Sequence, residues 1–140
     1  MMRGPVLAMV LVFSSLLVNP ACAPAEAEQE KEMQVGRVVI VAFTPKPGKE
    51  QQLLAAVKKH LVVLQAEKLI TDKPGYVMRA ADGTIVEVFE WRSAEAIQQA
   101  HTNPSVQALW TEFGAACDYT PLSKLKESQA MFAEFDAVAL

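Results

Sequence analysis

The stretch "GTIVEVFEWRSAEAIQQAH", residues 83–101, decides the fold, because its hydrophobic pattern changes from that of a strand to that of a helix. Its first half, "TIVEVFEW", is rich in β-branched and aromatic residues and predicts a strand. Ser93 can cap the helix that follows, and Glu95 in the first turn suits the positive end of the helix dipole. The stretch therefore predicts a strand that leads directly into a helix.

The residues before this stretch predict a hairpin, a helix and a further strand. The short strand "YVMRA" and the turn "ADG", residues 76–83, precede the stretch and predict an antiparallel hairpin with it. From about Lys49 to Lys68 the pattern is helical, with one narrow apolar stripe that contains a histidine: Leu53, Val57, His60 and Leu64, with Leu61 beside it. The continuous apolar run "VVIVAF", residues 38–43, predicts a first strand that is buried on both faces.

The residues after the stretch predict a second helix and a last strand. Asn103 followed by Pro104 is a cap with proline at the first helical position, so the first helix ends near "HTNP" and another begins. The apolar stripe of this helix is Val106, Leu109, Trp110, Phe113 and Cys117. "TPLSKLKES" predicts a loop with one helical turn, and "AMFAEFDAV", residues 130–138, predicts the last strand.

The order strand, helix, strand, strand, split helix, strand is typical of an α+β protein with the ferredoxin-like split βαβ fold. In that fold an antiparallel sheet carries its helices on one face. Both "VVIVAF" and "IVEVFEW" are apolar on both faces, so the uncovered face of the sheet needs a cover. We expect a second copy of the chain to supply it, which predicts a homodimer.

The N-terminus predicts export. Residues 1–27 combine Arg3 with a short apolar run and a choice of small-residue cleavage sites, which is typical of a secretory signal. In an alternative interpretation the signal ends before Cys22, which carries a lipid and anchors the protein to the cell envelope. Residues 28–35 then form a flexible tether, and residues 36–140 form one domain. We expect a periplasmic or extracellular protein that meets a membrane only through this lipid.

The composition narrows the classes of function. The net charge of −3 does not favour nucleic-acid binding, which needs a basic face. The two cysteines, Cys22 and Cys117, do not predict a disulfide framework. A single thiol on an apolar face, as at Cys117, is more often a small core residue than a reactive group.

Three ionisable residues are candidates for catalysis. His60 lies within an aliphatic stripe, so it is either a proton acceptor beside a cavity or a bonded core histidine. Glu87 shares a strand face with large apolar residues; it either orients a histidine as an acid–base dyad or pairs with Arg79 across the hairpin, and the cross-strand pair is the favoured interpretation. His101, near a helix end, either assists or supplies a favourable charge there.

Aromatic residues are candidates for substrate binding. They could form flat walls for a planar ligand, or simply belong to the core: Phe89, Trp91, Trp110 and Phe113. Two histidines and a glutamate could in principle bind a metal, but they lie on three separate elements without a short-spaced ligand pair. We therefore predict no metal site.

Taken together, "TPKPGKE", "DGT", "VEVFEWRSAEAIQQAH" and "NPSVQALWTEF" resemble the antibiotic-biosynthesis monooxygenase-like family of dimeric α/β barrels, over residues 36–138. The resemblance implies a dimer with a small cavity between sheet and helices in each subunit. It also implies oxygenation of a small quinol-like aromatic, without metal, flavin or another cofactor. The haem-degrading branch of the family has an asparagine on the first strand, which "VVIVAF" lacks, so we do not expect haem breakdown.

Two classes of function remain open at this point. In the first, the chain is a cofactor-independent monooxygenase in which His60 accepts a proton and Glu87 or His101 assists. In the second, it is a non-catalytic or stress-related module of the cell envelope that holds a small hydrophobic molecule in the same cavity. A base beside the cavity is required only by the first.

Overall fold

The computed structural model describes residues 35–139. The predictions of a signal at residues 1–27, of a lipidated Cys22 and of most of the tether lie outside these residues. The elements, in chain order, are β1 (Arg37–Pro45), α1 (Glu50–Ala66), β2 (Tyr76–Arg79), β3 (Ile85–Trp91), α2 (Ala94–Ala100), α3 (Pro104–Ala116), β4 (Cys117–Thr120), the 3-10 turns η2 (Leu122–Lys124) and η3 (Glu127–Gln129), and β5 (Asp136–Ala137).

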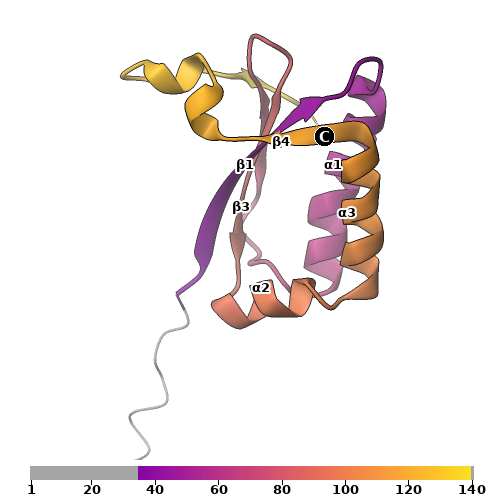
Figure 1. Cartoon of the computed structure of the whole chain (residues 1–140). Coiled ribbons are helices and arrows are strands. Elements are labelled where there is room, and N and C mark those ends of the chain that lie inside the picture. The colour runs from indigo at the N-terminus through magenta and orange to yellow at the C-terminus, as the bar shows by residue number, and fades with distance from the viewer. Residues whose placement is uncertain (1–34, 140) are drawn as a thin grey trace, which may run out of the picture. The chain divides into compact units, whose positions relative to one another are not determined.

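The strands form one five-stranded antiparallel sheet in the order β4-β1-β3-β2-β5. Helices α1 and α3 lie side by side on one face of this sheet, and α2 lies near one end of it (Figure 1). The first four strands have the order of the ferredoxin-like fold, which confirms the predicted fold class. We call the face that carries the helices the inner face and the opposite face the outer face.

The helix boundaries follow from local signals in the sequence. The Ser93 hydroxyl accepts a hydrogen bond from the backbone N–H of Ala96 at 3.2 Å, and the Asn103 side chain accepts one from Val106 at 3.1 Å. Both caps satisfy N–H groups that the first helical turn leaves free. In the hairpin turn, Gly83 has a φ of +91°, which glycine adopts without a steric cost.

The two last strands correct the sequence prediction. Helix α3 ends at Ala116, and Cys117 begins the edge strand β4, which pairs with the end of β1. The strand predicted at 130–138 was wrong in its extent, since only Asp136–Ala137 pairs, at the other edge beside β2. Cys117 nevertheless stays in the core, because β4 turns its side chain to the inner face, where the thiol donates to the Phe113 carbonyl at 3.2 Å.

The inner face is fully covered, whereas the outer face is covered only in part. Side chains from the C-terminal segment pack over one end of the outer face, against Ala42, Ala80 and Val86: Leu122, Leu125 and Phe135. The rest of this face exposes an outer apolar patch of three residues, with exposed fractions of 66%, 48% and 69%: Val38, Ile40 and Tyr76. The prediction that β1 is buried on both faces was therefore wrong for its first half within this chain.

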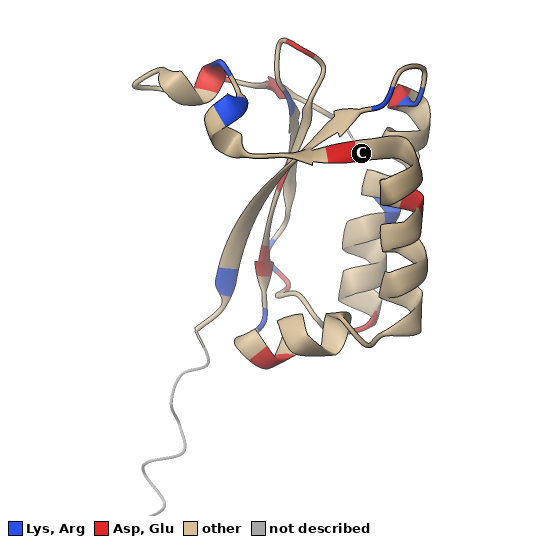
Figure 2. Ribbon diagram, viewed as in Figure 1, with Lys and Arg blue, Asp and Glu red and all other residues tan. Residues whose placement is uncertain are grey.

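Charged residues of both signs are interspersed along the elements (Figure 2). Exposed ion pairs include Lys59–Glu112 between α1 and α3 at 2.9 Å and Lys73–Glu90 at 2.6 Å. None of the helices in the part of the chain that the structure describes has the length and hydropathy that crossing a membrane requires.

Candidate active site

A cavity of about 160 Å³ lies between the inner face of the sheet and the helices α1 and α3. Its lining is almost entirely apolar and contains all four aromatic residues singled out in the sequence. The lining residues are Val39, Val41, Phe43, His60, Phe89, Trp91, Trp110, Phe113 and Tyr119. Tyr119, one of the lining residues, is more than half exposed. His60 is the one histidine in the wall.

His60 and Glu87 form a buried hydrogen-bonded pair at this cavity. The apolar stripe of α1 directs His60 at the sheet, and the alternation of β3 directs Glu87 at the helices. The Nδ1 atom of His60 lies 2.7 Å from the Oε2 atom of Glu87, and the two residues are 5% and 0% exposed. An imidazole ring or a carboxylate is seldom buried without a hydrogen-bond partner, and here each of the two is the partner of the other.

The pair fixes which nitrogen of His60 is available for chemistry. An ionised carboxylate can only accept hydrogen bonds, so Nδ1 must donate, and a neutral ring then carries its lone pair on Nε2. Nε2 is buried and has no hydrogen-bond partner among the described residues, and the same is true of Oε1 of Glu87. An oriented imidazole with a free Nε2 is the arrangement that a general base requires.

Aromatic rings surround the histidine on the cavity side. Phe89 and Phe113 both meet the His60 ring edge to face, with ring centroids 5.4 and 5.2 Å away. Trp91 lies edge to face with Phe89 at 5.2 Å, and Trp110 completes the wall. Flat apolar walls of this kind suit a planar aromatic ligand.

His101 is not part of this group. It is exposed at the C-terminal cap of α2, and its ring lies edge to face with Trp110 at 5.1 Å. It does not line the cavity, and no hydrogen bond links it to His60 or Glu87. The structure therefore brings together two of the three ionisable candidates and all four aromatic ones.

The favoured pairing of Glu87 with Arg79 was wrong. The register places Val77 opposite Glu87 and Ile85 opposite Arg79, and the Arg79 side chain is exposed near the edge of the sheet. Glu87 lies deep under α1 instead, where its carboxylate meets His60. The structure contains the contact between Glu87 and His60 that the sequence left as the alternative interpretation.

Sequence reasoning missed Tyr119, which lies on β4 at the cavity wall and meets Phe43 edge to face at 5.4 Å. Burial raises the pKa of Tyr119, and the negative charges of Cys117 and Glu87 raise it further. The phenol is therefore a proton-bearing donor at neutral pH. The alternation of "CDYT" could have located it, since Cys117 and Tyr119 point to the same face, but the segment was interpreted as helix and loop.

Within residues 35–139, no three side chains of histidine, cysteine, aspartate or glutamate gather closely enough to hold a metal ion. His60 and Glu87 make only a pair, and the second histidine lies elsewhere. The geometry of His60 and Glu87 suits proton transfer at Nε2 within an apolar, aromatic cavity.

The fold is similar to that of SnoaB, a cofactor-independent oxygenase from Streptomyces nogalater whose crystal structure is known. The TM-score is 0.50 and the sequence identity is 14%, and the match covers 59% of this chain and 84% of that chain. At this identity the likeness concerns the fold. No protein-family model and no curated protein matches the sequence.

Proposed function

We propose that the chain is a cofactor-independent monooxygenase for a small quinol-like aromatic, with the cavity at His60 as its active site. The observation that carries the proposal is the His60–Glu87 pair, which leaves a buried Nε2 without a protein partner at an aromatic cavity. The similarity of fold to an oxygenase that uses no cofactor is consistent with this chemistry.

The lining of the cavity supports a neutral aromatic substrate. Apart from His60, the Tyr119 hydroxyl and the indole N–H groups of Trp91 and Trp110, its side chains are apolar, and lysine, arginine, aspartate and glutamate do not occur among them. An anionic or cationic ligand would therefore lose its hydration without a compensating charge. A phenol needs only one acceptor, and Nε2 provides it.

In the proposed reaction, His60 Nε2 removes the hydroxyl proton of a bound naphthol, and Glu87 stabilises the resulting imidazolium. The electron-rich anion then reduces molecular oxygen at the carbon para to its oxygen, where a C–O bond forms. Loss of one oxygen atom as water leaves the quinone. For 1,5-dihydroxynaphthalene the balance is C₁₀H₈O₂ + O₂ → C₁₀H₆O₃ + H₂O, so the substrate supplies both electron pairs.

The test is oxygen consumption with 1,5-dihydroxynaphthalene, followed together with the visible absorption of the hydroxynaphthoquinone product. We expect one molecule of oxygen for each quinone and no hydrogen peroxide. A His60→Phe variant should lose about 10²-fold or more of the rate, which is the usual contribution of a general base. His101→Phe is the matched histidine control, and it should keep the rate because phenylalanine preserves the contact with Trp110.

The rival function, a non-catalytic binding module, makes a different prediction for the same probe. Binding can be followed by quenching of Trp91 and Trp110 fluorescence, since both rings line the cavity. If the wild-type protein binds the naphthol but consumes no oxygen above the uncatalysed rate, the oxygenase proposal is wrong and the binding function stands. Equal oxygen consumption by the wild type and His60→Phe would also contradict the proposal.

The proposed setting is a homodimer outside the cytoplasm. The outer apolar patch of Val38, Ile40 and Tyr76 supports an interface between copies, because large apolar side chains clustered on one face favour association. The signal-like residues 1–27 support export, either to a soluble form or to a lipid-anchored form through Cys22. Mass spectrometry of the mature N-terminus distinguishes these two forms.

A further inference from the structure

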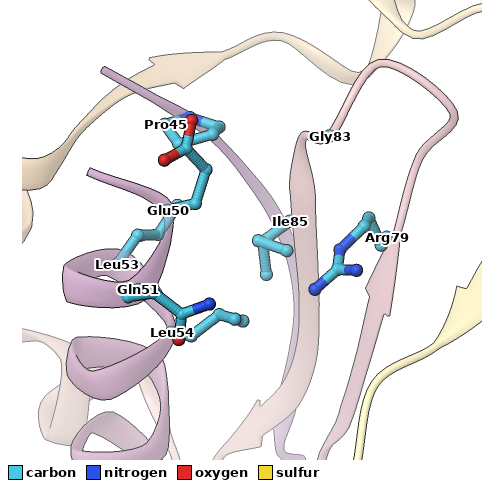
Figure 3. A pocket seen from close by; sticks show the side chains of 8 residues that line it. All are labelled: Pro45, Glu50, Gln51, Leu53, Leu54, Arg79, Gly83 and Ile85. Carbon is cyan, nitrogen blue, oxygen red and sulfur yellow. The ribbon is translucent and has the colours of Figure 1, made fainter. Parts of the chain in front are cut away.

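A second cavity, of about 280 Å³, lies between the first turns of α1 and the β2–β3 hairpin, apart from the cavity at His60. Figure 3 shows its side chains, which come from the end of β1, from α1, from β2 and from the start of β3. They are Pro45, Glu50, Gln51, Leu53, Leu54, Arg79, Gly83 and Ile85. None of these residues lines the aromatic cavity.

The floor of the second cavity is apolar and firmly packed. Leu53 and Ile85 are 0% and 3% exposed and belong to the main core, and Leu54 packs against the same cluster. Above this packed floor, the partly exposed side chains of Leu54 and Pro45 offer an apolar contact surface to a ligand. The volume lies just below the range for drug-sized ligands, about 300–1,000 Å³, so the cavity suits a small ligand.

Two side chains of opposite charge, Arg79 and Glu50, lie on different sides of this apolar floor (Figure 3). Arg79 extends from β2 towards Ile85, while the carboxylate of Glu50 lies across the cavity beside Pro45 (Figure 3). Within residues 35–139, neither of these two side chains forms an ion pair or a side-chain hydrogen bond. The cavity thus keeps a cation and an anion apart across an apolar surface instead of letting them neutralise each other.

We propose that this cavity binds a small zwitterion with a branched aliphatic body, as in a branched-chain amino acid. Arg79 binds the carboxylate, for which the guanidinium fork is suited, and Glu50 binds the ammonium group. Leu54 and Pro45, which are partly exposed, contact the aliphatic side chain above the buried Leu53 and Ile85. A ligand with both charges is favoured over a simple carboxylate, because Glu50 would repel the latter.

The test is titration of the full chain with L-leucine, followed by isothermal calorimetry and by amide chemical shifts. Arg79→Gln and Glu50→Gln should each weaken binding by about tenfold, which is typical for one charged hydrogen bond. Both positions are exposed, so these variants retain the core. Arg37→Gln removes an exposed arginine outside the cavity and should leave the leucine affinity unchanged.

Two analogues of leucine test each charge from the side of the ligand. 4-Methylpentanoate lacks the ammonium group and 3-methylbutylamine lacks the carboxylate, and both should bind about tenfold more weakly than leucine. The proposal is wrong if leucine fails to bind, if 4-methylpentanoate binds as tightly, or if Arg79→Gln has no effect. His60→Phe should retain leucine binding, so failure here and failure of the oxygenase proposal are separate results.

Discussion

Glu87 and His60 are 27 residues apart in the chain, yet their side chains meet at 2.7 Å under α1, and each is the other's only hydrogen-bond partner among the described residues. The pair joins the centre of the sheet to the middle of α1, the longest helix within residues 35–139. Because both side chains are buried, removing one leaves the other in an apolar surrounding without compensation.

A double-mutant cycle at this pair should give a large coupling energy. His60→Phe should lower the free energy of unfolding by about 3–5 kcal/mol, because Glu87 is then buried unpaired. Glu87→Leu should also destabilise, whereas the double variant should be more stable than the sum of the two effects predicts. Urea unfolding measures the free energy of unfolding of the wild type, the two single variants and the double variant.

The exposed pair Lys59–Glu112 provides the control for this cycle. Its partners are 57% and 46% exposed at the side chain, so its coupling energy should stay below about 1 kcal/mol. Strict additivity at His60 and Glu87 would mean that the buried contact does not exist in solution.

Asn103→Ala should lower the free energy of unfolding by about 1 kcal/mol, because Oδ1 of Asn103 caps α3 by accepting from the N–H of Val106. The exposed hydrogen bond that its Nδ2 donates to Glu67 is lost as well and contributes less. Gln98→Ala is the comparison, since Gln98 is exposed on α2 and should change the stability by less than about 0.5 kcal/mol. Thermal or urea unfolding monitored by circular dichroism distinguishes the two. Equal effects would argue against the cap.

Alkaline pH should destabilise the protein through Cys117. Burial raises the pKa of the Cys117 thiol from 9.0 to about 11; Asp118 raises it as well, and Lys46 lowers it. Between these pH values the folded chain keeps a proton that the unfolded chain has lost, so this contribution is complete below pH 9.0 and is lost as the pH rises to about 11. Cys117→Ala should make the unfolding free energy less dependent on pH in this window.

The reactivity of the same thiol gives an independent measurement. A buried thiol with a raised pKa forms little thiolate, so iodoacetamide should modify folded Cys117 much more slowly than the denatured chain at the same pH. Equal rates in the two states would contradict the buried position of Cys117 in β4.

Val38→Asp should convert the proposed homodimer to a monomer, because it places a charge within the outer apolar patch. Val62→Asp is closely matched, since Val38 and Val62 are 66% and 67% exposed, but Val62 lies on α1 on the other side of the sheet. Analytical ultracentrifugation of the wild type and both variants measures the oligomeric state directly. A wild-type monomer at all concentrations, or dissociation by Val62→Asp alone, would rule out this interface.

The helices and the central hairpin were predictable because their boundaries are local. The caps of α2 and α3 depend only on Ser93 and Asn103 and the residues that directly follow them. The hairpin turn depends on Gly83 in the same local way. Strand β4 was not predictable in this way. Cys117 continues the apolar stripe of α3, and only pairing of β4 with the distant end of β1 makes Cys117–Thr120 a strand.

In the candidate site, too, local features were predictable from the sequence and contacts between distant residues were not. The stripe of α1 identified His60 as a residue aimed at the sheet, and the alternation of β3 identified the face of Glu87. Their contact depends on how α1 packs on the sheet, and a local sequence pattern does not predict that packing. The expected Arg79–Glu87 pair failed because it assumed a register that places these residues opposite each other, whereas Val77 occupies that position.

Strand β1 lies between β3 and β4, and both of these neighbours come later in the chain. During synthesis, the apolar residues of "VVIVAF" therefore leave the ribosome with no strand to pair with until β3 is complete at Trp91, and the sheet cannot close at this edge before Thr120. Pairing over such sequence distances slows folding and prolongs the exposure of an aggregation-prone segment. A chain built in this order keeps β1 without both of its partner strands until most of residues 37–120 have been synthesised.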